Sequence, residues 1–266
     1  MSKHWEKVQE FTRAAIESHQ LLQAGAKVLV ATSGGPDSVL LARCLHHLGY
    51  QVHLAHVNYA LRAEASEAEE QLVRQYAHEW EVPVYVHRCQ PGELSQTDDS
   101  LQAAARKVRY QFFAEIMADK KIMTCATGHQ ADDQVETILL SLLRGNSPSI
   151  FSPIPIKRGP FIRPFLHIPR EHILQAIKEL RMQYGKDASN EKNIYLRNHI
   201  RNQLRPELQA INPSADAQLL RRNDWYQLQY QFVQHLLTPY LHSTGAVGFQ
   251  KARSQPLAVP PVMRTS

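Results

Sequence analysis

The chain has 266 residues, of which 43% are hydrophobic and 21% charged, with 11 glycines and 15 prolines. This composition suits a globular protein of one large or two modest domains and excludes collagen-like, disordered and coiled-coil chains. No apolar stretch reaches the roughly 18 residues that a membrane helix needs, and the N-terminal residues are charged where a signal peptide has its apolar core. We therefore expect a cytoplasmic protein that does not associate with a membrane.

Charge is distributed unevenly along the chain. Residues 1–150 contain 14 Lys and Arg against 18 Asp and Glu, whereas residues 151–266 contain 16 against 7. The basic second half predicts a polyanionic partner that binds mainly there. The three cysteines include no Cys-x-x-Cys pair, so we expect buried thiols rather than a disulfide framework or a thiolate metal site.

The first half alternates apolar, β-rich runs with helical patterns, which predicts an α/β fold with a doubly wound parallel sheet. The expected strands are 27–32, 51–57, 84–87 and 121–127. The expected helices are 38–48, 66–80, 100–118 and one that begins after residue 132. In the third helix, apolar residues recur at intervals of three and four and predict one buried face.

The second half is expected to be helical after an irregular connection. Six prolines between residues 145 and 169 allow at most an edge strand there. Helices are expected at 170–181, 194–208 and 216–237, followed by an irregular tail over the last 25 residues. We place a catalytic domain at 1–212 and a helical extension at 213–266.

The most informative segment is SGGPDS at residues 33–38, between the apolar run VLVAT and a helical pattern. Its glycines allow a tight turn, its hydroxyls add donors, and a new helix offers free N–H groups at the positive end of its dipole. The segment therefore predicts a phosphate site, although it is neither a Walker motif nor a GxGxxG fingerprint. A plain turn with a capped helix is the structural alternative.

A second candidate is GHQADD at residues 128–133, which follows one expected strand and opens the next helix. Asp132 and Glu136 share a helix face at the carboxyl end of a strand, where open α/β sheets bind ligands. We expect contacts with Mg²⁺ or substrate. Capping of the helix by acidic residues is the alternative.

The segment SGGPDS resembles the PP-loop, SGGxDS, of the N-type ATP pyrophosphatases, which split ATP between its α and β phosphates to adenylate a substrate. Over about residues 27–210, further motifs are similar in order and spacing to those of the tRNA(Ile)-lysidine synthetase family. They are HVNYALR at 56–62, AR at 105–106, RY at 109–110, GHQADDQVETILLSLLRG at 128–145, IRP at 162–164, DASN at 187–190 and YLRNHIR at 195–201.

The resemblance implies a set of site residues. ATP would be bound by Ser33, Gly34, Gly35, Pro36, Asp37, Ser38, His56, Gly128 and His129. Catalysis would involve Asp37, Asp132, Asp133 and Arg106, and the three aspartates would hold Mg²⁺, since an anion beside phosphates needs a bridging cation. Arg106 and Arg109 could clamp a phosphate or the lysine carboxylate. A solvated helix face is the alternative for the arginines, and a structural hydrogen bond is the alternative for His56.

The implied reaction attaches free L-lysine to the wobble cytidine in the CAU anticodon of an isoleucine tRNA, with release of AMP and pyrophosphate. Arg197, Arg201 and Arg205 recur every four residues beside an apolar stripe, so this helix can pack on one side and offer guanidinium groups to the tRNA. A solvated charged face is the alternative.

Some features depart from the family. The family's glycine-rich stretch after Gly145 is replaced by NSPSIFSP, Tyr59 stands where histidine is usual, and relatives continue into further tRNA-binding domains. A short natural form and a truncated chain, which could bind ATP or tRNA without turnover, both stay open, as does a homodimer. Rival functions are tRNA thiolation, which the absence of Cys-x-x-Cys disfavours, and small-molecule amidation, which leaves the basic half unexplained.

Overall fold

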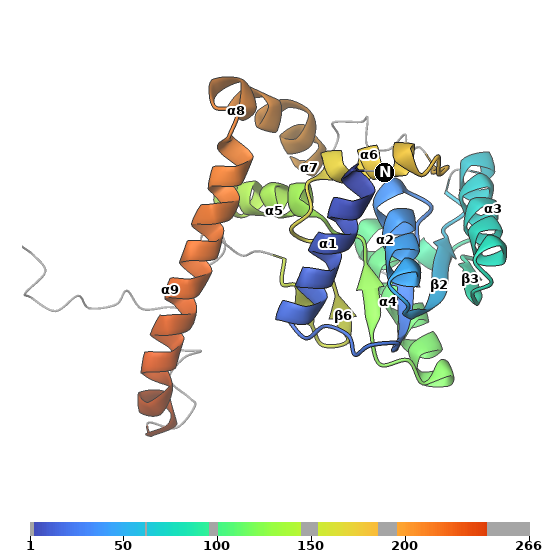
Figure 1. The fold of residues 1–266 in the computed structure, drawn as a ribbon, viewed down its shortest axis with the longest axis horizontal. Helices are drawn as coiled ribbons and strands as arrows, with labels where there is room; N and C mark the ends of the chain where they lie inside the picture. The colour runs from blue at the N-terminus through green and yellow to red at the C-terminus, as the bar shows by residue number, and fades with distance from the viewer. Residues whose placement is uncertain (1–2, 62, 96–100, 145–153, 186–195, 244–266) are drawn as a thin grey trace, which may run out of the picture. The chain divides into compact units, whose positions relative to one another are not determined.

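The computed structural model describes residues 3–61, 63–95, 101–144, 154–185 and 196–243 (Figure 1). The chain divides into two compact units, residues 1–216 and 217–266. The first unit contains the sheet, and the described part of the second belongs to helix α9 (Ala215–Ser243). Within the described ranges, no helix combines the length and hydropathy needed to span a membrane. The boundary expected after residue 212 stays a prediction.

A six-stranded sheet in the order β3-β2-β1-β4-β6-β5 forms the centre of the first unit. All neighbouring strands are parallel except β5 and β6, which form an antiparallel pair at one edge. The strands are β1 (Lys27–Ala31), β2 (Gln51–Asn58), β3 (Val84–Arg88), β4 (Cys125–Thr127), β5 (Lys157–Arg158) and β6 (Phe161–Ile162).

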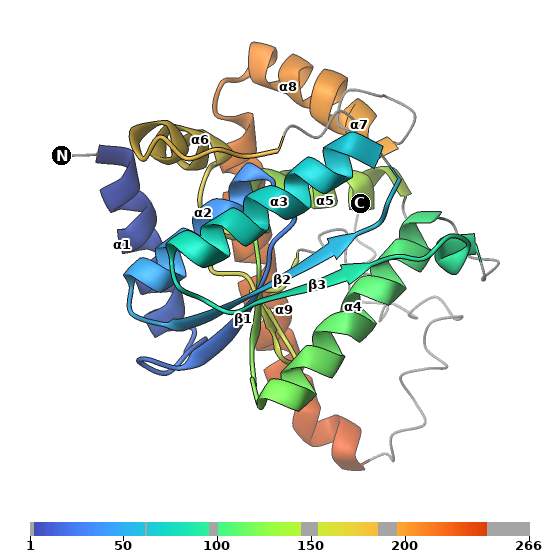
Figure 2. The same cartoon turned by 90° about the vertical axis from the view of Figure 1, so that its right-hand side faces the viewer.

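Helices cover both faces of this sheet (Figure 2). On one face lie α1 (Lys3–Ser18), α2 (Pro36–His47), α3 (Ala63–Glu79) and α6 (Arg170–Glu179), and on the other lies α4 (Leu101–Lys120). Strand β1 alternates between the two cores, because Val28 and Val30 belong to the first core and Leu29 to the second, where it meets Phe113 of α4. The predicted doubly wound α/β sheet is confirmed.

The order of the strands reverses at β1, since β2 and β3 follow on one side of it and β4 lies on the other. Open α/β sheets bind ligands at the carboxyl ends of the strands beside such a reversal. The parallel register pairs Ala31 with Thr127, the last residues of β1 and β4. The fold therefore brings SGGPDS and GHQADD, which follow these strands, to one place.

Two predicted regions differ in detail from the structure. Strand β4 is shorter than the expected 121–127, because α4 continues to Lys120 and the chain turns at Lys121 with a φ of 53°. The proline-rich connection contains two short strands, β5 and β6, instead of at most one edge strand. Pro160 precedes β6, and its carbonyl accepts a hydrogen bond from the Cys125 N–H (2.9 Å). Residues 145–153, 187–190 and the tail beyond 243 lie outside the described residues.

Helix α1 is absent from the predicted elements. Trp5, Val8, Thr12 and Ile16 are its buried residues, and their spacing of three and four is the signal that could have revealed it. The N–H groups of His4 and Trp5 donate to the carboxylate of Glu179 at the end of α6, at 3.1 and 2.9 Å. This contact joins the N-terminus to the last helix of the α/β region.

Candidate functional site

The loop between β1 and α2 is held in shape by its own hydroxyl groups. The Ser38 hydroxyl donates to the Gly35 carbonyl (3.0 Å) and accepts from the Ser33 N–H (3.1 Å), and the two serine hydroxyls lie 3.1 Å apart. Gly35 occupies the N-cap position of α2, so no side chain caps the helix. The N–H groups at the start of α2 thus keep their capacity to bind an anion.

Two glycines allow the backbone around this loop to pack closely. Gly34 has a φ of 88°, and a Cβ there would lie 3.1 Å from the Cβ of Glu69. At Gly128, a Cβ would lie only 3.0 Å from the backbone of Asp37 and Ser38. Since backbone atoms at the start of α2 cannot move aside cheaply, only glycine fits where β4 meets the loop.

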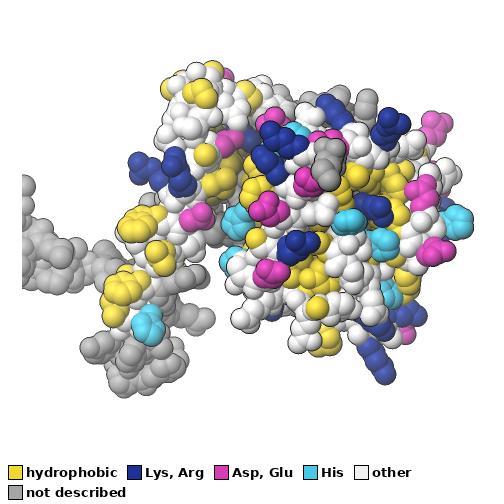
Figure 3. All heavy atoms as spheres, viewed as in Figure 1, with side chains coloured by type: hydrophobic (Ala, Val, Ile, Leu, Met, Phe, Trp, Pro, Cys, Tyr) yellow, Lys and Arg dark blue, Asp and Glu magenta, His cyan; other side chains and the backbone are white. Residues whose placement is uncertain are grey.

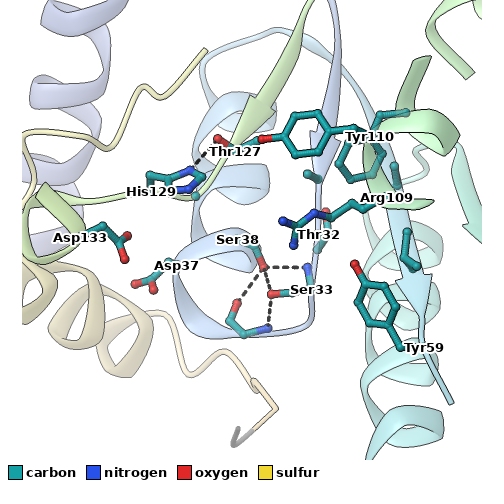
Figure 4. A pocket seen from close by; sticks show the side chains of 16 residues that line it. Thr32, Ser33, Asp37, Ser38, Tyr59, Arg109, Tyr110, Thr127, His129 and Asp133 are labelled. Atoms are coloured by element: carbon teal, nitrogen blue, oxygen red, sulfur yellow. Dashed lines mark hydrogen bonds between the residues drawn. The ribbon is translucent and has the colours of Figure 1, made fainter. Parts of the chain in front are cut away.

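The loop opens into a cavity of about 270 Å³ at the carboxyl ends of β1, β2 and β4 (Figure 4). Seven of the residues predicted to bind ATP or to act in catalysis line it: Ser33, Gly35, Asp37, Ser38, Gly128, His129 and Asp133. The opposite wall is formed largely by β2 and α4, with Ala55, Val57, Tyr59, Arg109, Tyr110 and Phe113. One end of the cavity is therefore acidic and polar, whereas the other is aromatic.

The carboxylates of Asp37 and Asp133 point toward each other at the acidic end (Figure 4). Oδ1 of Asp37 is buried and has no hydrogen-bond partner among the described residues. Burial raises the pKa of Asp37 to about 6; the repulsion of Asp133 and Asp132 adds to the rise, and the Arg170 guanidinium, 4.0 Å away, opposes it. A buried anionic oxygen without a partner fits a cation ligand.

Side chains cap the start of helix α5 (Ala131–Arg144), which is the alternative given above for its acidic residues. Oδ2 of Asp133 accepts the Gln130 N–H (3.0 Å), and Asp132 donates its N–H to the Gln130 side chain (2.6 Å). Asp132 does not line the cavity, and the three aspartates do not meet as one close group of ligand atoms in the described structure. Asp37 and Asp133 both line the cavity and are thus the better placed pair for a cation, with Asp37 offering the oxygen that has no partner.

The predicted arginine stripe faces these acidic residues. It spans helix α7 (Leu196–His199), a π-helical turn (Ile200–Leu204) and helix α8 (Arg205–Ile211) instead of one regular helix. Arg197 reaches Glu136 (2.6 Å) and Asp133 (2.8 Å), and Arg201 holds Glu136 through two nitrogens, at 2.5 and 3.1 Å.

Arg205 completes this arginine ladder, defined as Arg197, Arg201 and Arg205. Its guanidinium binds the carboxylates of Asp132 and Asp216. The Glu136 side chain is fully buried, and the guanidinium groups of Arg197 and Arg201 compensate the cost of burying its carboxylate. Basic and acidic side chains are also mixed over the face drawn in Figure 3. The ladder therefore braces α5, and most of its charge is compensated within the protein.

The aromatic end of the cavity includes Arg109, which was not among the predicted catalytic residues. Arg109 lines the cavity, whereas Arg106 is exposed and lies over the Tyr110 ring, 4.6 Å from its centroid. Both arginines belong to α4, and the three-residue spacing alone does not decide which one faces the sheet. The Tyr59 hydroxyl donates to the Ala105 carbonyl (3.3 Å), which fixes this ring against α4.

The two predicted histidines occupy different environments. His129 lines the cavity, with Nδ1 2.9 Å from the Thr127 hydroxyl. Burial lowers the pKa of His129 to about 4, with help from nearby arginines, so the ring is neutral at pH 7. His56 does not line the cavity; it is buried and donates from Nδ1 to the Thr32 carbonyl (2.9 Å). This is the structural bond named as the alternative for His56.

We predict that Gly128→Ala weakens ATP binding by about tenfold or more, because the added Cβ displaces the backbone of the loop. Gly159→Ala is the control, since a Cβ there meets no atom within 4 Å and Gly159, with a φ of 57°, belongs to the turn between β5 and β6. Calorimetric titration with ATP measures both. Equal affinity of wild type and Gly128→Ala would contradict the close contact.

We further predict that Asp37→Asn stabilises the protein at neutral pH without ligands. An ordinary pKa of 3.8, raised to about 6 by folding, means that the native state binds more protons between about pH 4 and 6. Stability is thus lost as pH rises through this window. The variant cannot ionise and should gain on the order of 2–3 kcal/mol at pH 7 but little at pH 4.

Urea unfolding at a series of pH values measures this difference. Asp119→Asn is the control, because the Asp119 carboxylate is 70% exposed. If Asp37→Asn is no more stable than wild type at pH 7, burial does not raise the pKa of the Asp37 carboxyl group.

Comparison with known proteins agrees with this geometry. Residues 5–208 match the model of a family described as the PP-loop domain. The chain is 35% identical over 210 residues to a tRNA(Ile)-lysidine synthase of Bacteroides thetaiotaomicron, which covers 79% of this chain and 49% of that protein. Over 239 residues it is 36% identical to the tRNA(Ile)-lysidine synthase of Geobacillus kaustophilus, covering 86% and 52%. The chain spans about half the length of these curated relatives.

A similar fold occurs in the solved structure of the U34-tRNA thiolase NcsA of Methanococcus maripaludis. The TM-score is 0.66 at 16% identity, over 83% of this chain and 78% of that one. This likeness supports the fold alone. The family model, however, covers most of the chain and includes both the SGGPDS loop and the GHQADD segment that meet at the cavity. The chain therefore belongs to the PP-loop domain family.

Proposed function

We propose that this chain ligates free L-lysine to the position-2 carbon of the wobble cytidine in the CAU anticodon of an isoleucine tRNA, using ATP. The observation that carries the proposal is one cavity in which the phosphate-binding loop, an unpartnered buried carboxylate and an aromatic wall converge. The similarity to proteins named tRNA(Ile)-lysidine synthase supports the choice of lysine and this tRNA as substrates.

The loop would bind the pyrophosphate part of ATP. Free N–H groups at the start of α2, with Ser33 and Ser38, supply donors to the phosphate oxygens. The aromatic wall with Tyr59 and Tyr110 offers rings for stacking of a base, and Arg109 offers a guanidinium for a phosphate or a carboxylate. A polar end beside an aromatic end suits a nucleotide, which has charged phosphates and a flat base.

In the first step, O2 of the cytosine forms a bond to the α-phosphorus of ATP, and the bond to pyrophosphate breaks. In the second step, the ε-nitrogen of lysine forms a bond to C2, and the bond from C2 to the AMP oxygen breaks. The amine also has to lose its protons, since a lysine side chain titrates near 10.4. The carboxylates at the acidic end of the cavity attract the ammonium group and are candidates for accepting a proton.

Mg²⁺ fits the unpartnered Oδ1 of Asp37, and the nearby Asp133 would join it by exchanging its contact with Arg197 for the ion. When bound, the ion would offset the negative charge that develops on the phosphate oxygens. Asp132 stays a predicted ligand, although its two oxygens accept from Arg205 and, at 3.4 Å, from the Arg170 N–H. The role of Arg106 in catalysis likewise stays a prediction.

The rival reaction, tRNA thiolation, finds little support in the cavity. Cys44, Cys89 and Cys125 are buried, and none of them belongs to the cavity lining that the structure describes. A sulfur-transferring enzyme would need a reactive thiol or a cluster beside the adenylated base. Ligation by an amine needs neither, so lysine transfer is the better match to these residues.

The test is the transfer of radiolabelled lysine to an isoleucine tRNA transcript with a CAU anticodon, in the presence of ATP and Mg²⁺. We expect label in the tRNA that depends on ATP and is lost in Asp37→Ala and in a transcript with uridine at the wobble position. Bound ATP without label would favour a chain that binds but does not turn over. Label that persists in Asp37→Ala would contradict the role of this carboxylate.

A second test concerns the arginine ladder. If the ladder binds tRNA, the double substitution Arg201→Ala with Arg205→Ala should reduce the slope of log affinity against log salt by about one to two. Glu136→Gln is the control, because it weakens the bracing of α5 and keeps the arginines. Filter binding at several salt concentrations measures the slope. An unchanged slope in the double variant would restrict the ladder to a structural role.

A further inference from the structure

Three side chains of different chemistry meet at the carboxyl end of β3, away from the cavity lining. They are His87, Cys89 and Glu93, and one ligand atom from each lies within 4.8 Å of the other two. Among the described residues, this is the one group of three or more histidines, cysteines and carboxylates that comes so close.

The local fold prepares this cluster. His87 and Cys89 are two residues apart on an extended segment, so their side chains point to the same face, and the Cys89 N–H continues the ladder by donating to the Asn58 carbonyl (2.9 Å). The chain then turns at Gly92, with a φ of 85°, and the Glu93 N–H donates to the Gln90 carbonyl (3.1 Å). The turn carries the Glu93 carboxylate back over the strand.

Hydrogen bonds hold the carboxylate in this position. Oε2 of Glu93 accepts the Gln90 N–H (2.8 Å), and Oε1 lies 2.9 Å from Nε2 of His87. The His87 ring also packs against Phe112, with centroids 5.4 Å apart. The imidazole and carboxylate are partly exposed and the thiol is buried, so an ion can enter from the solvent side.

We propose that His87, Cys89 and Glu93 form a binding site for Zn²⁺, with an imidazole nitrogen, a thiolate sulfur and a carboxylate oxygen as ligands. This donor set is one that zinc accepts in proteins, and three protein ligands leave a fourth position for water. A His87–Glu93 ion pair would explain two of the residues but not the thiol beside them. The site does not depend on the proposed lysine transfer.

Binding of Zn²⁺ has to change the protonation of Cys89 and the hydrogen bond between His87 and Glu93. Burial raises the pKa of the Cys89 thiol to about 11, and the charge of Glu93 adds to this, so the sulfur is protonated at pH 7 without metal. Binding forms the Zn–S bond and releases the thiol proton to solvent, while the His87–Glu93 hydrogen bond gives way to two metal bonds.

The experiment titrates the chelator-treated full chain with Co²⁺ as a spectroscopic probe and then displaces it with Zn²⁺. We expect a thiolate-to-cobalt charge-transfer band in the near ultraviolet that saturates at one thiolate-bound Co²⁺ per chain, and a site of carboxylates alone does not produce this band. Because this band is measured on the wild-type protein, the result does not depend on whether a variant folds.

Substitutions then assign the ligands. Cys89→Ser should remove the band, and His87→Gln and Glu93→Gln should each weaken Zn²⁺ binding by at least about tenfold in competition with a chromophoric chelator. His53→Gln and Glu67→Gln are matched controls, since His53 pairs with Tyr85 and Glu67 with Arg88, and both should bind as wild type does. No band in wild type, a band that survives in Cys89→Ser, or Zn²⁺ affinity unchanged in His87→Gln and Glu93→Gln would overturn the proposal.

Discussion

The parallel pairing of β1 with β4 is the constraint on which the candidate site depends. It aligns the ends of two strands that are distant in sequence, so that Ala31 stands beside Thr127. The loops that follow these strands therefore pack closely. A side chain at Gly128 would clash with the backbone of the other loop. A phosphate-binding turn and an acidic helix start thus become one cavity.

Electrostatic compensation follows from this crowding. Asp37, Asp132, Asp133 and Glu136 lie near the same edge of the sheet, where their mutual repulsion would disfavour the folded state. The arginine ladder and Arg170 supply the opposite charge from a later part of the chain. Compensation is incomplete at Asp37. Its raised pKa and its unpartnered oxygen indicate that a cation bound there would stabilise the site most.

This arrangement changes how the basic half of the sequence is understood. A stripe of arginines at intervals of four residues suggests a surface for a polyanion, yet here the guanidinium groups bind protein carboxylates. A π-helical turn lies in the same segment, where it alters the regular spacing of side chains along the helix. If the ladder binds tRNA, its arginines must contact the phosphates while they also bind the carboxylates of α5. Binding of tRNA would then affect the acidic end of the cavity directly.

Local sequence patterns predict the alternation of strands and helices, the class of the sheet and the SGGPDS and GHQADD segments, because hydrophobic period and turn residues are local properties. They did not reveal α1, although its apolar spacing was present, nor the partners of the arginine ladder. Tertiary packing places Arg109 in the lining of the cavity and Arg106 outside it, and it directs the His56 ring to the Thr32 carbonyl instead of the cavity. It also gathers His87, Cys89 and Glu93. The physical reason is that the direction of a side chain and the partner of a charge depend on which distant segments pack together, and no short stretch of sequence contains that information.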